Sequence, residues 1–594
     1  MCGIMAYIGQ KQAYPILMNG LKKLEYRGYD SSGVALMNGT LSLLKKEGKV
    51  SSLEKFASNR KTDGNIGLGH TRWATHGKPS DINAHPHQSQ SKKLTIVHNG
   101  IIENHDALKS TLIKNGFQFQ SQTDTEVLVQ LIEWIQIKYN VSTTSALSRA
   151  LEMVEGSFAI VLFDLNQPNK LWAARRQSPL VLGLGQKELY ISSDAMPLAN
   201  YVEEVIYLKN DMVLEMNDTG SYEIFDLDLS SVKLNPTKII QEEMTCDKNG
   251  FETFMEKEIY EQPNCVSQIL SSGITEDLNL NFDRIVITAC GTSWHSGLIA
   301  EYLIEKYARI NVEVEYASEF RYRYPVLSKR DLVIGISQSG ETADTIAALE
   351  LAKSNGCKTL GLINVDHSTI SRIVDNYILL KAGPEIGVAS TKAFTNQIVA
   401  LLIILNKLIE KKNPEVSEFV SKQLLSLPNL LEETLKNQNI HEVASMIAKH
   451  KSVLFLGRGL MYPVALEGAL KLKEITYIHA EGYPAGEMKH GPIALIDKNV
   501  PVIAICNDDE NLLKMLSNIE EVKARNAKVI IIKNKNVIIP EALADYIIEI
   551  PDCPEILSPV LQNIPLQLLA HRTADLLGLD IDKPRNLAKS VTVE

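Results

Sequence analysis

The sequence predicts a multidomain protein of mixed α/β and α+β class, on three observations. Its 594 residues exceed what one hydrophobic core holds and suggest three or four domains of ~100–200 residues each. Up to about residue 235, short β-rich runs alternate with Gly, Pro, Asn and Asp, which favours a largely antiparallel sheet packed between helices. From about residue 250, buried strands alternate with helical runs, a pattern typical of parallel βαβ units.

The composition is that of an ordinary globular protein. Hydrophobic residues make up 45% and charged residues 22%, and a formal net charge of −10 argues against a nucleic-acid partner. The seven cysteines lack paired spacing, so neither a disulfide framework nor a zinc module is expected, and a reducing cytoplasm fits. No signal-peptide pattern opens the chain and no apolar run reaches ~18 residues, so we expect neither secretion nor a membrane span.

The N-terminus carries a candidate nucleophile. Removal of Met1 would leave Cys2 with both a thiol and a free α-amine. An α-amine has a pKa near ~8, so its neutral form can accept the thiol proton, and one residue then supplies both nucleophile and base. A small residue at position 2 is the simpler alternative, and the mechanism depends on the loss of Met1.

Three further segments accompany this cysteine. Residues 69–77 read Gly-His-Thr-Arg-Trp-Ala-Thr-His-Gly after a short alternating strand. Residues 94–104 form a second strand, which we expect to end on Asn-Gly. Residues 121–126, Ser-Gln-Thr-Asp-Thr-Glu, are expected to cap a helix over residues 127–135.

Together with Cys2, these segments resemble the glutaminase domain of class II amidotransferases, which are N-terminal nucleophile (Ntn) hydrolases of αββα fold. The resemblance implies that Cys2 attacks the glutamine amide, giving a thioester and ammonia, and that Asn99 and the Gly100 N–H form the oxyanion hole. It also implies that Arg72 binds the glutamine α-carboxylate and Asp124 its α-ammonium. Taken singly, simpler explanations are favoured: Asn99-Gly100 as a hairpin turn, Arg72 as a surface charge and Asp124 as a helix cap. The combination favours the glutaminase interpretation.

Histidines are frequent between residues 70 and 98, and Ala-His-Pro-His at residues 84–87 suggests a metal site. No cysteine or carboxylate completes a ligand spacing, so we expect no metal. Residues 72–80 are expected to form a mobile lid over glutamine, with Trp73 and His76 as glutamine-binding residues. Trp73 is further expected to gate the passage of ammonia.

Residues 331–342 carry the second kind of chemistry. An apolar strand ends in Ser-Gln-Ser-Gly-Glu-Thr, and a helix is expected over residues 343–353. The first N–H groups of such a helix are unpaired and lie at the positive end of its dipole, which favours an anion such as a sugar phosphate. Four residues add side-chain donors: Ser337, Gln338, Ser339 and Thr342. The alternative is that Ser339 or Thr342 only caps the helix.

This loop resembles the phosphosugar-binding loop of sugar isomerase (SIS) domains, which are parallel αβα sandwiches. The strand-loop pattern of residues 285–291 and 332–337 returns at residues 452–459 and 501–507, which indicates an internal duplication. The second copy has three carboxylates, residues 508–510, where the first has Ser-Gly-Glu. Because carboxylates repel phosphate, only the first copy is expected to bind a sugar phosphate.

Further sugar-site residues follow from the same resemblance. Ser293 opens a helix after the first strand, and Val388 with its two successors could meet sugar hydroxyls. In the helical run 466–475, Glu467, Lys471 and Glu474 share one face; an exposed ion pair is the usual explanation of such spacing. Residues 390–391 could alternatively just cap the apolar helix that follows them.

The segment 485–492, Ala-Gly-Glu-Met-Lys-His-Gly-Pro, resembles the glutamine:fructose-6-phosphate aminotransferase (isomerising) family, the glucosamine-6-phosphate synthases. The resemblance spans the whole chain. It implies that Glu474 moves a proton between sugar carbons C2 and C1, that His490 opens the ring and that Lys471 contacts the sugar phosphate. Lys589, in a polar tail that otherwise would be expected to fray, would form a Schiff base with the open-chain ketose.

The implied domains are a glutaminase domain (1–235), a linker and first helix (236–265), two SIS domains (266–430 and 431–580) and an active-site tail (581–594). The implied reaction converts glutamine and fructose 6-phosphate to glutamate and glucosamine 6-phosphate, the first step of hexosamine synthesis. Ammonia would pass through an internal channel, since free ammonia protonates in water. No cofactor, nucleic acid or membrane is expected, and the expected assembly is a cytoplasmic homodimer.

Two alternatives remain. A phosphoribosyl-transferring amidotransferase would need a pyrophosphate-binding loop that the sequence lacks. A non-enzymatic regulator built from paired SIS domains would leave Cys2, Arg72, Asn99 and Asp124 unexplained.

Overall fold

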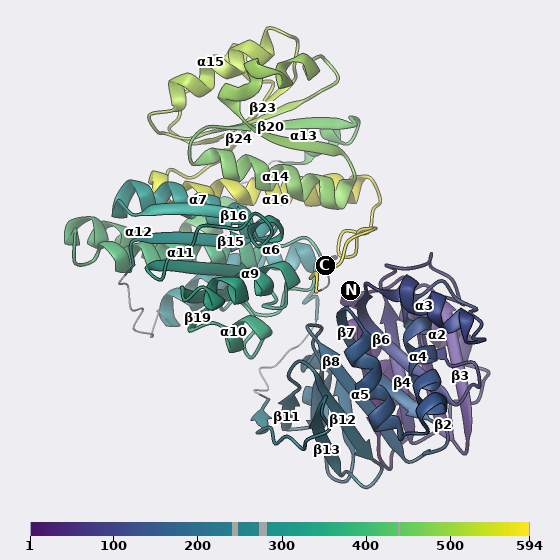
Figure 1. Cartoon of the computed structure of the whole chain (residues 1–594). Helices are drawn as coiled ribbons and strands as arrows, with labels where there is room; N and C mark the ends of the chain where they lie inside the picture. The colour runs from purple at the N-terminus through teal and green to yellow at the C-terminus, as the bar shows by residue number, and fades with distance from the viewer. Residues whose placement is uncertain (1, 240–246, 273–281, 437–439, 593–594) are drawn as a thin grey trace. The chain divides into compact units, whose positions relative to one another are not determined.

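The computed structural model describes residues 2–239, 247–272, 282–436 and 440–592. These residues divide into two compact units, Met1–Met244 with Ser590–Glu594 and Thr245–Lys589 (Figure 1). Each unit is considered by itself. Residues 240–246 of the expected linker lie outside the described residues, whereas Thr237–Lys238 form an edge strand of the first unit.

Two antiparallel sheets form the first unit. The larger runs in the order β14 (Thr237–Lys238), β11 (Glu204–Tyr207), β9 (Val181–Leu184), β10 (Leu189–Ser192), β1 (Gly3–Ile8), β4 (Ile66–Arg72), β2 (Ser31–Asn38) and β3 (Thr40–Glu47). The smaller runs in the order β13 (Tyr222–Asp226), β12 (Met212–Asn217), β8 (Lys170–Arg176), β7 (Gly156–Asp164), β6 (Leu94–Ile102) and β5 (His87–Gln88). The helices are α1 (Ala13–Leu24), α2 (Val50–Ala57), α3 (His105–Lys114), α4 (Asp124–Tyr139) and α5 (Thr143–Met153).

Strand periodicity explains the layering of this unit. On β1, Ile4, Ala6 and Ile8 enter a core shared with β6, β7 and β8 of the other sheet. The alternate residues Met5 and Tyr7 point the other way, into a core shared with α1 and α2. A third core lies between the smaller sheet and helices α3 to α5. The order helix, sheet, sheet, helix confirms the predicted αββα fold.

Two local expectations for this unit are wrong. The strand β6 does not end at Asn99–Gly100 but pairs with β7 through Ile102, so these residues form no hairpin turn. Gly100 is needed there because its φ is +133° and a Cβ would lie 2.1 Å from the Ser157 carbonyl oxygen. Helix α4 begins at Asp124 rather than at residue 127, and its N-cap is Thr123, whose side chain accepts a hydrogen bond from the Glu126 N–H.

Two parallel five-stranded sheets form the second unit. The first runs in the order β16 (Asn311–Tyr316), β15 (Arg284–Ala289), β17 (Asp331–Ser337), β18 (Lys358–Ile363) and β19 (Asn376–Leu379). The second runs in the order β21 (His479–Pro484), β20 (Ser452–Gly457), β22 (Val502–Cys506), β23 (Val529–Asn534) and β24 (Tyr546–Ile550). Because the order of equivalent strands is the same in both sheets, the predicted duplication is confirmed.

Helices cover both faces of each sheet. In the second copy, α15 (Leu512–Lys523) lies on one face, and α14 (Met461–Thr476) and α16 (Ser558–Leu576) lie on the other (Figure 1). The first copy and the connections contain α6 (Phe254–Ser272), α7 (Thr292–Ala308), α8 (Ala317–Phe320), α9 (Ala343–Ser354), α10 (Thr369–Ile373), α11 (Lys392–Ile409), α12 (Pro414–Lys436) and α13 (His441–Ile447). One hydrophobic core joins α7 and α11 of the first copy to α14 and α16 of the second, so the two copies are packed as one body.

Helix α6 does not end at Pro263, as its sequence suggests, but continues to Ser272. Proline removes the N–H that would bond to the carbonyl of Ile259, four residues earlier. The side chain of Gln262 supplies the missing donor, with its Nε2 2.9 Å from that carbonyl oxygen. An internal proline loses a hydrogen bond and its ring clashes with the preceding turn. The side-chain bond of Gln262 compensates for the lost hydrogen bond.

Within the described residues, α11 alone is long and apolar enough to cross a membrane. However, 83% of its apolar window is buried inside the protein. Its first residue, Lys392, forms an ion pair with Glu261 at 2.7 Å. These contacts are those of a core helix.

Candidate functional site

Cys2 lies immediately before β1, and its main chain and side chain both have partners from other elements. The Trp73 N–H donates to its Sγ at 3.2 Å, and the Asn99 Nδ2 donates to its carbonyl oxygen at 3.0 Å. Burial raises the pKa of the Cys2 thiol, although the positive charge at the chain N-terminus opposes this rise. The thiol therefore needs a neighbouring base before it can act as a nucleophile.

Arg27 is a site residue that the sequence analysis did not find. Its side chain is only 3% exposed, its Nε donates to the Cys2 carbonyl at 3.3 Å, and its Nη1 pairs with Asp194 at 3.5 Å. Arg27 and Asn99, which lie far apart in the sequence, thus donate to the same carbonyl oxygen. An arginine after a helix carries no sequence signal of such a role; only the fold brings it to Cys2.

Arg72 ends β4 and is 2% exposed. Its Nη2 donates to the carbonyl oxygens of His76 and Gly77, while its Nη1 has no hydrogen-bond partner among the described residues. Burial lowers the pKa of Arg72, and the charges of Cys2 and Asp124 oppose this, so the three groups share one site. An arginine stays charged in such a site, and its unused N–H groups suit a carboxylate.

Asp124 is buried at the first turn of α4. One carboxylate oxygen accepts from the Ile102 N–H at 2.9 Å and the other from the Thr125 N–H at 3.0 Å. The interpretation of Asp124 as the helix cap is wrong, because Thr123 has that place. The carboxylate is instead fixed between β6 and α4.

The segment expected to form a lid, residues 72–80, is held by hydrogen bonds at its start. The Ala74 N–H donates to Asp30 at 2.8 Å, and the Trp73 ring contacts the edge of Tyr29 with centroids 5.7 Å apart. His76 contacts His105 through its ring, with centroids 4.7 Å apart. The main chain of Trp73 therefore stays beside the Cys2 thiol. The His76 side chain remains partly exposed.

The buried histidines of this unit form no metal centre: no group of three or more His, Cys, Asp or Glu suited to a metal ion occurs in the part of the chain that the structure describes. Four of them, however, are packed together behind Asn99: His70, His85, His87 and His98.

In the second unit, the loop between β17 and α9 is internally hydrogen-bonded. The Ser337 hydroxyl lies 2.8 Å from the Thr342 hydroxyl and accepts from the Gly340 N–H at 3.0 Å. Thr342 is the N-cap residue of α9, but its side chain makes no capping bond, so simple capping does not explain the loop. Gly340 has φ +65°, and a Cβ there would lie 2.0 Å from the Ser368 Oγ. The loop geometry therefore depends on glycine.

Glu341 fixes the same loop from its other side. Its carboxylate accepts from the N–H and the hydroxyl of Thr369, both at 2.7 Å, at the start of α10. This carboxylate is therefore neutralised by a helix start rather than directed at a bound anion.

Lys471 joins the two copies. It is fully buried, and its Nζ lies 3.0 Å from the Thr292 hydroxyl, 3.3 Å from Glu467 and 2.6 Å from Glu474. Burial alone would lower the pKa of Lys471, but the two carboxylates outweigh burial and raise it. Because both Glu467 and Lys471 are 0% exposed, the explanation as a surface ion pair is wrong.

The carboxylate of Glu467 also reaches α7 of the first copy. It lies 2.7 Å from the His295 Nδ1 and accepts from Thr292 at 3.1 Å. Ser293, next in sequence, accepts from the Gln397 Nε2 on α11 at 2.9 Å. The start of α7 therefore lies between Lys471 of the second copy and α11 of the first copy, to which α7 itself belongs.

Lys589 is buried against Glu385, with 2.5 Å between its Nζ and a carboxylate oxygen. Glu385 also accepts from the N–H groups of Thr391 and Ala393 and from the Ser390 hydroxyl, at 2.9 to 3.0 Å. Burial would raise the pKa of Glu385, but Lys589 and these donors lower it to about 2. Glu385, not Ser390 or Thr391, thus caps α11.

The tail before Lys589 is also attached to the second unit. Asp582 accepts from the N–H groups of Phe254 and Met255 at the start of α6, both at 2.9 Å, and its carbonyl accepts from the Val388 N–H at 3.0 Å. A frayed tail is therefore the wrong interpretation for residues 582–589, and Val388 is positioned by the tail.

His490 is not brought to these groups. It is exposed and ends a short 3-10 segment, Ala485–His490. It makes no hydrogen bond or ion pair with any residue that the structure describes. The structure thus joins Ser293, Lys471 and Glu474 around the start of α7, and Lys589 to the loop with Val388, but leaves His490 apart.

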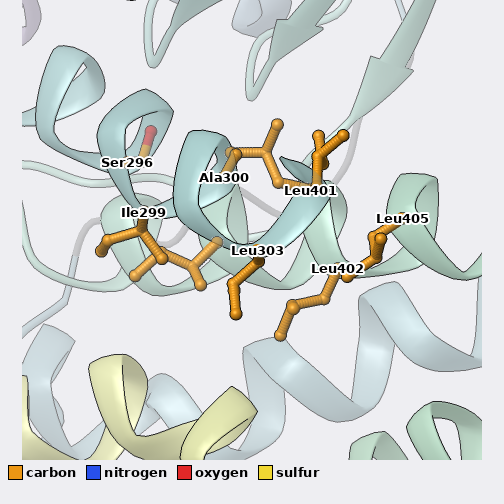
Figure 2. A pocket seen from close by; sticks show the side chains of 9 residues that line it. Ser296, Ile299, Ala300, Leu303, Leu401, Leu402 and Leu405 are labelled. Atoms are coloured by element: carbon orange, nitrogen blue, oxygen red, sulfur yellow. The ribbon is translucent and has the colours of Figure 1, made fainter. Parts of the chain in front are cut away.

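A crevice between α7 and α11 is lined almost entirely by apolar side chains (Figure 2). Its walls are isoleucine, leucine and alanine side chains, apart from Ser296. The Ser296 hydroxyl donates to the Ser293 carbonyl at 2.7 Å and is not available to a ligand. The crevice is a packing seam of the helix pair.

Family models agree with this division of the chain. A glutamine amidotransferase domain matches residues 70–200, and a SIS domain matches residues 281–407 and again residues 446–574. The fold, the cysteine site and the doubled parallel sheets therefore define the class: a glutamine amidotransferase domain followed by two SIS domains.

Relatives of known activity match over the full length. A glutamine–fructose-6-phosphate aminotransferase (isomerizing) of Bacteroides thetaiotaomicron is 48% identical, and one of Chlorobaculum tepidum is 47% identical, with 100% of both chains covered in each case. The C-terminal domain of a glucosamine-fructose-6-phosphate aminotransferase from Francisella tularensis is 40% identical, with a TM-score of 0.55, over 57% of this chain and all of that one. The chain belongs to the glutamine–fructose-6-phosphate aminotransferase (isomerizing) family.

Proposed function

We propose that the chain converts glutamine and fructose 6-phosphate to glutamate and glucosamine 6-phosphate. The observation that carries the proposal is the pairing of two sites in one chain. One is a partly buried cysteine whose carbonyl oxygen accepts from the Asn99 amide and the Arg27 guanidinium, and the other is the ion pair of the fully buried Lys471 with Glu474, in a unit that also contains a phosphosugar-type loop. Family membership over the full length supports the same reaction.

In the first half-reaction, the Cys2 Sγ attacks the side-chain carbonyl of glutamine, and the free α-amine of Cys2 takes the thiol proton after removal of Met1. The oxyanion receives hydrogen bonds from the Asn99 Nδ2 and the Gly100 N–H. The proton then passes to the leaving nitrogen, ammonia departs, and water hydrolyses the thioester. The unpaired Nη1 of Arg72 would bind the substrate carboxylate, and Asp124 its ammonium.

In the second half-reaction, the phosphate binds at the start of α9, where the loop hydroxyls and N–H groups provide donors. Four loop residues would make these contacts: Ser337, Gln338, Ser339 and Thr342. Lys471 and Ser293 would hold the sugar at the start of α7. Lys589 must lose a proton and leave Glu385 before its amine attacks C2 of the open-chain ketose, and the carbonyl oxygen then leaves as water to give the Schiff base. Ammonia adds to C2 and Lys589 departs as a free amine. Glu474 then removes the C1 proton and returns one to C2.

The proposal includes a protected passage for ammonia, because ammonia released to water becomes ammonium and loses its nucleophilic lone pair. It also includes a cytoplasmic homodimer without a cofactor. The proposal keeps His490 as the ring-opening residue; it is exposed, and no hydrogen bond or ion pair joins it to a residue that the structure describes. The domain limits proposed are those of the sequence analysis, with the tail from residue 581 as part of the sugar site.

Product analysis tests the proposal. The purified chain and a Cys2→Ala variant are incubated with glutamine and fructose 6-phosphate, separately and together. Equal formation of glutamate and glucosamine 6-phosphate, lost in the variant, is the expected result. Glutamate without amino sugar would point to another acceptor. Phosphosugar binding without any product would favour a regulator.

A further inference from the structure

The direction of the Asn99 amide decides whether it can stabilise an oxyanion. An amide carries two N–H bonds on one atom and a carbonyl oxygen on the other, and a flip exchanges them. In this structure one N–H of Nδ2 is used by the Cys2 carbonyl at 3.0 Å, so the second remains for the substrate. The partner of the opposite end, Oδ1, therefore determines the donor direction.

That partner is His70. Its Nε2 lies 3.0 Å from the Asn99 Oδ1 and 2.9 Å from the His98 carbonyl oxygen. Both oxygens are acceptors, so Nε2 must carry the proton and share it between them. The other ring nitrogen, Nδ1, is buried and has no hydrogen-bond partner among the residues described.

His70 is also kept neutral and immobile. It is 0% exposed, and burial lowers its pKa to about 3, so the ring stays neutral at neutral pH, and the two acceptors at Nε2 set its tautomer. The His85 ring stacks on it with centroids 4.0 Å apart. The Thr125 hydroxyl holds His85 at 2.8 Å and His98 at 2.9 Å, which ties the stack to α4 beside Asp124.

We propose that His70 is a positioning residue for glutamine hydrolysis: its Nε2–H holds the Asn99 Oδ1, so that Nδ2 faces the charge that develops at Cys2. The inference rests on the proposed glutaminase half-reaction and adds a residue to it. Without His70, the amide can turn and present its oxygen to the oxyanion. Removal of one oxyanion-hole donor lowers kcat by about 10²–10³-fold, and a similar loss is expected.

The test compares His70→Phe, which removes the donor, with His70→Gln, whose side-chain amide can restore an N–H at the position of Nε2. His87→Phe is the matched control, because His87 is buried in the same stack but contacts Thr123 rather than Asn99. Glutaminase kcat is measured together with inhibition by L-glutamate γ-semialdehyde. Its adduct with the Cys2 thiol carries the oxygen that occupies the oxyanion hole. Inhibition by glutamate measures ligand binding, and the rate of Cys2 alkylation measures thiol reactivity. Neither requires an oxyanion to form.

For His70→Phe, kcat and semialdehyde affinity should fall together by about 10²-fold, while glutamate affinity and alkylation change by less than about 3-fold. His70→Gln should recover most of kcat, and His87→Phe should lose little. In an Asn99→Ala background, His70→Phe should have little further effect, because His70 acts through Asn99.

Two results would overturn the inference. In one, His70→Phe retains kcat. In the other, kcat, glutamate affinity and alkylation fall equally in His70→Phe and in His70→Gln, which indicates general damage to the site. Absence of glutaminase activity in the unmodified chain would instead refute the proposed function, and the inference with it.

Discussion

Replacement of Glu385 by glutamine should release the C-terminal tail from the sugar site. Glutamine keeps an oxygen for the N–H groups of Thr391 and Ala393, so the cap of α11 is retained. It removes the negative charge 2.5 Å from the Lys589 Nζ. Both side chains are almost fully buried, 0% and 3% exposed, so solvent does not screen the loss.

The magnitude follows from the pKa of Glu385, which is lowered from 4.5 to about 2. A shift of this size corresponds to about 3 kcal/mol in favour of the charged form. The backbone donors that glutamine keeps account for part of it, which leaves ~2–3 kcal/mol for the ion pair. Each 1.4 kcal/mol is a factor of ten, so the ratio of released to docked tail should rise roughly 30- to 150-fold.

Limited trypsinolysis measures this ratio. Trypsin must bind the Lys589 side chain, which is 3% exposed in the docked tail, so the bond after Lys589 is cleaved only from the released form. Its rate should rise roughly 30- to 150-fold in Glu385→Gln while cleavage is slower than tail closure, and synthase activity should fall. Ser390→Ala, which removes one hydroxyl donor from the same carboxylate but leaves its charge, should change the rate by less than about 5-fold. Equal rates for Glu385→Gln and the unmodified chain, or for the two variants, would refute the reasoning.

Three further outcomes are expected. First, the glutaminase unit should lose stability in acid, because burial lowers the pKa values of its four packed histidines and the unfolded chain therefore binds protons below about pH 6.5 that the folded chain does not. His70, whose pKa is about 3, should alone make the unfolding free energies at pH 7.5 and pH 5 differ by about 2 kcal/mol in chemical denaturation, and a flat profile would contradict this. Second, burial and Glu385 raise the pKa of Glu258 to about 8, so its ionisation destabilises the fold increasingly between pH 4.5 and 8. Glu258→Gln should therefore gain about 3 kcal/mol relative to the unmodified chain between pH 5 and 8, and a constant difference in unfolding free energy would exclude it. Third, Gly340→Ala should weaken fructose 6-phosphate binding at least 10-fold in calorimetry, because its Cβ meets Ser368 at a positive φ. Unchanged affinity would show that the loop does not hold the phosphate.

Features that depend on neighbouring residues could be predicted from the sequence. The period of apolar residues gave the strand before Ser337 and the helix after it, and repetition of that pattern gave the two parallel sheets. Short motifs marked Cys2, Arg72, Asn99 and Asp124 as one group, and the fold brings them together, although their roles in catalysis stay predictions. Each of these inferences needs only residue types and spacings.

Features that depend on residues far apart in the sequence became visible only in the folded chain. Helix α6 passes Pro263 because packing and the Gln262 side chain offset the lost bond, and β6 passes Asn99 because β7 pairs with it throughout. The pairing of Lys589 with Glu385 joins residues 204 positions apart. No local pattern contains such a contact, because the attraction between the two charges becomes strong only where the folded core excludes water from both. Motifs can therefore name the reactive groups, but the residues that hold them in place appear only when the chain is folded.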